Sequence, residues 1–297
     1  MRTLPWAIVE ALQGDPGEVV IAAPGDGPGY WAGGPSAVYS DGAFWLAYRL
    51  RRPVGLGRGY ANVIARSRDG VRFETVSVVT NDSFGSASLE RPCLVPLADS
   101  GWRLYVSCSK TASKQWWVEA ADVRDPAEFG TANHRVVLPS DDDSAWKDVV
   151  VRRDGSDWTM WACRHPLSDG DDQADRMESW YATSGDGLNW DLHGPALLPA
   201  AGGWDQRGTR ITSVIRADHD WVAFYDGRES AEQNWEETTG VTVSSRPDSF
   251  RAAPEPVRPG DLRTLRYLNV VETDDGVRVY FEIARPDGAH ELRTVHV

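Results

Sequence analysis

The feature of this sequence that most constrains its fold is an internal repeat with a period of about sixty residues. Each unit holds a hydrophobic strand, an Asp/Gly turn and a second strand rich in aromatic residues, and the first unit runs from Ala37 to Tyr48. Its counterparts begin at Cys93, Val149, Ser213 and Asn269, at intervals of 56 to 64 residues. Short strands repeated at this spacing are typical of the four-stranded blades of a β-propeller.

A second element recurs later in the first four units, where a polar turn is followed by an aromatic residue. Its copies are Ser67 to Phe73, Asp122 to Phe129, Ser184 to Trp190 and Ser245 to Phe250. Asp and Gly set the geometry of such turns. We therefore expect these segments to be structural, with the aromatic side chain packed between neighbouring sheets.

Five units account for the length of the chain. The sequence predicts an all-β protein, one five-bladed β-propeller domain over 1–297, with blades at about 31–80, 88–140, 146–200, 204–258 and 264–297. The last unit ends after its third strand, while a spare strand, 18–23, precedes the first unit. We predict that this N-terminal strand completes the last blade and closes the ring, which would remove free sheet edges.

Composition limits the partners of the protein. The 31 Lys and Arg residues against 44 Asp and Glu residues give a net charge of −13, which argues against nucleic acid or an anionic membrane as a partner. No apolar run near the N-terminus is long enough for a signal peptide or a membrane span, so we expect a cytoplasmic protein. The three cysteines lack the spacing of a disulfide framework or a zinc site. No cofactor is indicated, although a calcium ion in the channel is an open possibility.

Tryptophan is unusually frequent, with 14 residues in 297. Core packing can absorb many of these side chains, but exposed indoles also serve as stacking platforms for the flat apolar faces of ligands. In a propeller the innermost strands line the central channel, and residues at their starts project to one mouth. Four of the five predicted inner strands carry charged groups just ahead of an apolar run.

Carboxylates and basic residues are therefore expected together at this mouth. Sugar chemistry uses such an arrangement, because one carboxylic acid protonates the leaving oxygen while a second carboxylate activates water or attacks directly. Glu90 and Asp148 are the candidates for the catalytic acid and base, and Asp205 and Glu282 are expected to support them. The candidates for substrate binding are Arg91, Lys147, Arg164, His165, Asp226, Arg228, Tyr267 and Trp31.

Each candidate also has a structural interpretation. The acids and bases may pair only with one another, and a lone His beside a Pro is often a local contact. For Lys147 and Arg164 we favour the binding of an anionic substrate group, for which Arg supplies two parallel donors.

The third repeat resembles a known family. Residues 146–151 (WKDVVV) and 158–166 (WTMWACRHP) resemble the Lys-Asp strand and the basic, Pro-terminated second strand of the five-bladed β-mannoside phosphorylase and mannosidase family. Glu90-Arg-Pro92 resembles its Glu-Asp-Pro element, and Trp204-Asp205 its fourth-blade opening. Arabinanase and fructosidase propellers are more loosely similar. The resemblance implies a propeller with inward carboxylates that acts on glycosides.

The sequence departs from the family at two points. The family's Asp between Glu and Pro, which we expect to be its proton donor, is Arg91 here. The Asp-Pro that opens the first blade in arabinanase-type propellers is Gly34-Pro35. These differences favour hydrolysis over phosphorolysis.

Three functions remain open from the sequence. The first is a glycoside hydrolase-like enzyme that transforms a small-molecule or oligosaccharide substrate in the central cavity by carboxylate acid/base catalysis. The second is a propeller that binds a glycan or an anionic metabolite without turnover, which the change at Arg91 favours. The third is a glycosidase scaffold recruited for a non-hydrolytic reaction, because function resides in the site and not in the fold.

Overall fold

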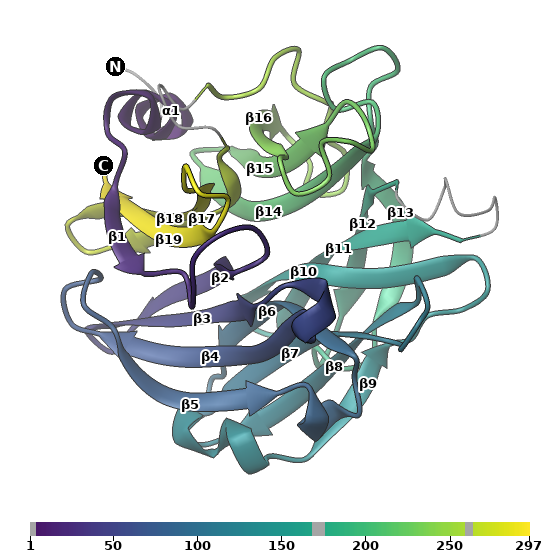
Figure 1. Ribbon diagram of the computed structural model, residues 1–297. Helices are drawn as coiled ribbons and strands as arrows, with labels where there is room; N and C mark the ends of the chain where they lie inside the picture. The colour runs from purple at the N-terminus through teal and green to yellow at the C-terminus, as the bar shows by residue number, and fades with distance from the viewer. Residues whose placement is uncertain (1–3, 168–175, 259–263) are drawn as a thin grey trace.

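A computed structural model describes residues 4–167, 176–258 and 264–297 of the chain. Antiparallel β-sheets are arranged in a ring around a common centre, and the chain passes through them in order, from the purple and blue first sheet to the yellow last one (Figure 1). The predicted all-β, five-bladed fold is confirmed. The first described residues and the C-terminus lie on the same side of the ring (Figure 1).

Each of the first three blades is a four-stranded sheet whose strands pair in chain order. The first blade contains β2 (Trp31–Ser40), β3 (Ala43–Arg51), β4 (Gly59–Ser67) and β5 (Glu74–Thr80). The second contains β6 (Ser88–Pro96), β7 (Trp102–Ser109), β8 (Trp116–Val123) and β9 (His134–Leu138). The third contains β10 (Ser144–Asp154), β11 (Asp157–Pro166), β12 (Glu178–Ser184) and β13 (Asp191–Leu197).

The last two blades each have three consecutive strands among the described residues. The fourth blade contains β14 (Gly208–Ala217), β15 (Asp220–Arg228) and β16 (Thr238–Ser244). The fifth contains β17 (Arg266–Thr273), β18 (Gly276–Ala284) and β19 (His290–His296). Short 3-10 helices lie in the connections of the first two blades: η1 (Val54–Leu56), η2 (Asp82–Phe84) and η3 (Pro126–Thr131).

The N-terminal segment packs on the fifth blade. Strand β1 (Glu18–Ile21) pairs antiparallel with β19, with Glu18 opposite Thr294, so it occupies the fourth-strand position of that blade. That this strand closes the ring stays a prediction. The sequence did not predict helix α1 (Leu4–Gly14) before it, whose Ile8 and Leu12 are buried in the same cluster as Phe281. The spacing of these two residues places them on one face of the helix.

The recurring polar turns connect each blade to the one before it. In the first blade the backbone amide of Gly70 donates to the Ser67 hydroxyl (2.9 Å). The hydroxyl of Tyr280, in the fifth blade, donates to the Gly70 carbonyl (2.9 Å), and Phe73 packs on the Tyr280 ring. The third blade repeats this contact, since Tyr105 of the second blade donates to the Gly187 carbonyl (2.6 Å). These turns therefore serve the structure, as predicted.

All five inner strands are irregular near their starts. The pairing of β2, β6, β10, β14 and β17 with the next strand shifts register there, as expected for β-bulges. At corresponding places the backbone of Gly34, Asp148 and Tyr267 is left-handed, with φ of 59°, 52° and 51°. A bulge bends a strand and redirects its side chains. These bulges determine which residues face the mouth of the channel.

Candidate functional site

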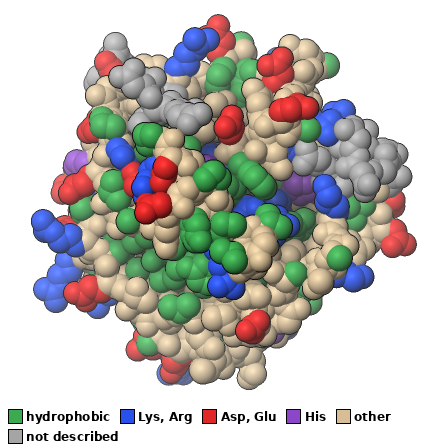
Figure 2. Space-filling model, viewed as in Figure 1, with side chains coloured by type: hydrophobic (Ala, Val, Ile, Leu, Met, Phe, Trp, Pro, Cys, Tyr) green, Lys and Arg blue, Asp and Glu red, His purple; other side chains and the backbone are tan. Residues whose placement is uncertain are grey.

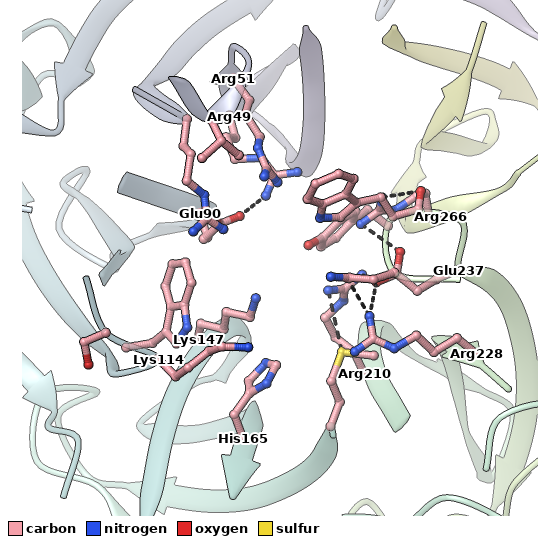
Figure 3. Close-up of a pocket in the computed structure, with 18 residues that line it drawn as sticks. Arg49, Arg51, Glu90, Lys114, Lys147, His165, Arg210, Arg228, Glu237 and Arg266 are labelled. Atoms are coloured by element: carbon pink, nitrogen blue, oxygen red, sulfur yellow. Dashed lines mark hydrogen bonds and ion pairs between the residues drawn. The ribbon is translucent and has the colours of Figure 1, made fainter. Parts of the chain in front are cut away.

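The mouth of the channel holds a small, strongly basic pocket of about 260 Å³. All five blades contribute to its wall, and the labelled side chains point toward a common space (Figure 3). Two of its side chains are acidic, Glu90 and Glu237, and eight are basic: Arg49, Arg51, Arg58, Lys114, Lys147, Arg210, Arg228 and Arg266. Basic and apolar side chains gather near the middle of the face shown in Figure 2. A cationic pocket in a protein of net charge −13 points to an anionic ligand.

Two of these arginines come from the second strand of the first blade. Arg49 and Arg51 both lie on β3 and are two residues apart, so they point to the same side of the sheet. The sequence showed basic residues at the end of this strand, but the resemblance assigned them no role. They lie beside Glu90 at one side of the pocket (Figure 3).

Glu90 lines the pocket, as the sequence predicted, and it is held by basic neighbours. It forms a hydrogen-bonded ion pair with Arg49 and lies 3.8 Å from Arg58. Burial opposes its charge, but Arg49 and Lys147 outweigh this effect and hold the pKa of Glu90 well below its usual range. Glu90 is thus ionised at neutral pH, so it can accept a proton but has none to donate.

Glu237 is the second acid of the wall, and the sequence did not indicate it. It follows β15 in a connection that matches no repeated motif, which is why the pattern could not reveal it. Its carboxylate lies 3.0 Å from Arg266, 3.5 Å from Arg228 and 3.6 Å from Arg210. These arginines overcome the cost of burial and lower the pKa of Glu237 to about 2.

Asp148 lies beneath the pocket and does not line it. This side chain is fully buried, and its carboxylate accepts hydrogen bonds from the Tyr267 hydroxyl (3.1 Å), from Arg210 (3.3 Å) and from the Arg91 backbone amide (3.1 Å). Its contacts join four blades, the second to the fifth. Tyr267 does line the pocket, with the Arg210 guanidinium 4.0 Å from its ring centre.

Asp226 and Glu282 also lie behind the wall. Asp226 accepts from Arg210 (2.8 Å), and burial raises the pKa of its carboxyl to about 6. Glu282 contacts His290 (2.7 Å) and lies 3.6 Å from Arg266 and 3.7 Å from Arg49. A side chain at Gly33 would overlap the Glu282 carboxylate, since a Cβ there would lie 1.7 Å from Oε2. Both acids neutralise and position the arginines that face the ligand.

Two predicted site residues lie away from the pocket. The Asp205 carboxylate accepts from the Tyr225 hydroxyl (2.9 Å) and from the Ala200 amide (3.2 Å), which fixes the loop before β14, and burial raises its pKa. Arg164 donates to Glu178 (3.0 Å) on the neighbouring strand β12. Its neighbour His165 does line the pocket, because successive residues of a strand point to opposite faces.

Arg91 crosses the channel instead of facing the mouth. Its guanidinium donates to the carbonyl oxygens of Pro35 (2.9 Å), Val149 (3.2 Å) and Thr212 (2.9 Å), so one side chain of the second blade links the first, third and fourth blades. The residue at the position of the family's expected proton donor is therefore a structural cross-link here.

Arg51 has no acidic partner. Its side chain is 4 % exposed, and among the described residues it forms no hydrogen bond or ion pair. It lies over the rings of Trp31 (4.2 Å) and Trp235 (5.1 Å). Burial lowers the pKa of Arg51 to about 10. Glu90 acts on this guanidinium only without direct contact, and a buried charge that lacks a direct partner is costly.

A second cavity of about 480 Å³ adjoins the basic pocket, and Asn234 and Trp235 line both. Trp31, a predicted binding residue, faces this cavity and not the first one. Its buried indole N–H has no hydrogen-bond partner among the described residues.

Three further observations concern metals, membranes and thiols. In the described parts of the chain, no three His, Cys, Asp or Glu side chains are grouped as a metal ion would require. The described helices include none with the length and apolar character needed to cross a membrane. The three cysteines, Cys93, Cys108 and Cys163, are buried free thiols.

Comparison with known proteins gives structural matches only. No model of a protein family and no curated protein sequence matches the chain. One similar structure comes from the GH130 family of mannoside phosphorylases, which is described as containing glycoside hydrolases that target β-1,2 mannosidic linkages in Candida mannan. The match has a TM-score of 0.64 and 17 % identity, and it covers 92 % of this chain and 85 % of that one. A thermostable family-43 glycoside hydrolase matches with a TM-score of 0.69 and 10 % identity over 94 % and 92 %.

A glycosyl hydrolase from Bacteroides ovatus is also similar, with a TM-score of 0.62 and 16 % identity over 92 % of this chain and 85 % of that one. At these identities the similarity establishes the fold, which is the propeller of glycoside hydrolases and mannoside phosphorylases. The expected structural relationship to these enzymes is confirmed.

Proposed function

We propose that this protein is a carbohydrate-active enzyme whose substrate is a sugar carrying a carboxylate or a phosphate group. The fold is that of glycoside hydrolases and phosphorylases, and the pocket lies at the mouth of the channel. The observation that carries the anionic part of the proposal is Arg51, a buried cation that forms no direct ion pair among the described residues, in a wall of eight basic residues. A volume near 260 Å³ lies just below the usual range of ligand sites, roughly 300–1,000 Å³, and suits one sugar unit.

In hydrolysis, one kind of residue would take a proton from water and another kind would donate a proton to the leaving oxygen. Glu90 is the ionised carboxylate positioned to take a proton from water as the water oxygen bonds to the anomeric carbon. Glu237 is ionised as well, so neither acid of the wall can protonate the leaving oxygen. That proton would come from His165, another titratable group of the wall.

A second candidate function is a non-hydrolytic reaction of an anionic sugar. Two observations favour it: the carboxylates at the mouth are ion-paired with arginines, and Arg91 links the blades across the channel. The pair of free carboxyl groups that glycoside hydrolysis usually needs is therefore lacking among the described residues. Arginines that neutralise a substrate anion support proton abstraction or elimination as readily as hydrolysis.

Product analysis tests the proposal. The purified protein is incubated with neutral mannosides, arabinosides and fructosides and with matched uronic-acid and phosphorylated glycosides, each with and without inorganic phosphate. We expect products from an acidic glycoside and none from its neutral counterpart. A free sugar indicates hydrolysis, a sugar 1-phosphate indicates phosphorolysis, and an unsaturated product indicates elimination. Turnover of neutral glycosides alone would contradict the proposal.

A further inference from the structure

Lys147 differs from every other cation of the pocket. The chain has only three lysines, Lys110, Lys114 and Lys147, so nearly all of its basic residues are arginines. Lys147 lies on the inner strand β10, half-buried, and its amine points into the pocket (Figure 3). Lys114, the other lysine of the wall, is exposed in the connection between β7 and β8.

The amine of Lys147 is not engaged by an acid. Among the described residues it forms no hydrogen bond or ion pair, and its Nζ lies over the Trp116 ring, 4.6 Å from the ring centre. Glu90 is taken by Arg49, and Asp148, the adjacent residue, by Arg210 and Tyr267. The carboxylates that would normally hold a lysine as an ammonium ion are therefore committed to other donors.

The surroundings of Lys147 make its ammonium form easier to deprotonate than that of an exposed lysine. Burial lowers its pKa, Asp148 and Glu90 act in the opposite direction, and Arg210 adds to the lowering. Lysines that are desolvated or placed beside another cation are the ones that attack carbonyl groups in enzymes. Arginine cannot do this, because its guanidinium stays protonated.

We propose that Lys147 is a nucleophilic amine that forms an imine with a small carbonyl compound bearing a carboxylate or phosphate, such as the open-chain form of a sugar acid. The Nζ lone pair bonds to the carbonyl carbon, and the carbonyl oxygen takes up a proton to become a hydroxyl. This hydroxyl then leaves as water while nitrogen loses its remaining proton, which gives the C=N bond. The basic wall holds the anionic group, so this inference rests on the proposed anionic ligand.

Reductive trapping tests the proposal without knowledge of the natural substrate. The protein is incubated near neutral pH with pyruvate or glyoxylate and sodium cyanoborohydride, and the modified lysines are identified by peptide mass spectrometry. Because burial lowers the pKa of Lys147, more of its amine is free near neutral pH than in an exposed lysine. We expect Lys147 to be labelled at least about tenfold faster than Lys110, and we expect inorganic phosphate to protect it.

The controls separate this inference from the proposed function. Lys147→Arg keeps the charge but should lose the label, whereas Lys114→Arg should keep it. Labelling of Lys147 at the rate of Lys110 would overturn the inference. If acetaldehyde labels Lys147 as fast as glyoxylate does, and phosphate does not slow the labelling, the anionic substrate class is overturned. If uronates or phosphate still bind when trapping fails, the imine is wrong and the proposed function stands; if neither occurs, both are wrong.

Discussion

Replacement of Arg51 by Met should make the ligand-free protein more stable while it abolishes binding of an anionic ligand. The pKa of Arg51 is lowered from 12.5 to about 10 by burial. At about 1.4 kcal/mol for each pH unit, this shift corresponds to about 3 kcal/mol by which the folded state disfavours the charged side chain. The penalty is fully present at neutral pH, because it is relieved only as the pH rises through the folded pKa toward the unfolded one.

The contacts with Trp31 and Trp235 return part of this energy. A cation–π contact contributes about 2 kcal/mol when desolvated, as with the buried Trp31, and about 0.5–1 kcal/mol when exposed, as with Trp235, so the two together offset about 2–3 kcal/mol. Met retains much of the apolar volume beside both rings. We therefore expect Arg51→Met to stabilise the protein by up to about 1 kcal/mol, which raises Tm by at most about 2 °C for a chain of this length. Differential scanning calorimetry without ligand measures this, and a lower Tm than wild type would refute the reasoning.

Three other perturbations follow from the same contacts. Arg49→Met should destabilise the protein by about 3–5 kcal/mol in urea unfolding, because Glu90 would lose its partner inside the structure; an unchanged midpoint would contradict the ion pair. The pKa of Glu237 is lowered from 4.5 to about 2, so its contribution to the free energy of unfolding is present above pH 4.5 and is lost as the pH falls toward 2. The stability of Glu237→Gln should therefore fall less steeply than that of the wild type between pH 4.5 and 2. Parallel plots of stability against pH for the two proteins would refute this. Deletion of residues 1–22 should expose the edge of β19, lower Tm and promote association detectable by light scattering, whereas a monomer of wild-type stability would contradict closure by β1.

The sequence predicted the architecture because the architecture is periodic. Strands, Asp/Gly turns and packed aromatics recur five times, and each copy reinforces the assignment of the others. The sequence did not predict helix α1 because the helix occurs once and its buried face is small. Only Ile8 and Leu12, together with Pro5 at its start, are buried. A single short helix leaves no repeat to compare.

The sequence was less informative about the site. It placed Glu90, Lys147, His165, Arg228 and Tyr267 at the mouth, and the structure brings these five together. It could not show that the bulges would bury Asp148 or turn Arg91 across the channel, because the direction of a side chain at a bulge depends on tertiary packing. Nor could it reveal Glu237 or the missing partner of Arg51, since both depend on which residues of distant blades meet.

The central claim is that the pocket recognises a negative charge on a sugar. Isothermal titration of matched pairs, such as glucuronate with glucose, galacturonate with galactose and mannuronate with mannose, tests it most directly. A hydrogen bond to a charged group contributes about 1.5–3 kcal/mol, so at least one uronate should bind about 10- to 100-fold more tightly than its neutral parent, and Arg51→Met should remove that difference. Neutral sugars that bind as tightly as the uronates, or a preference that survives in Arg51→Met, would contradict the account.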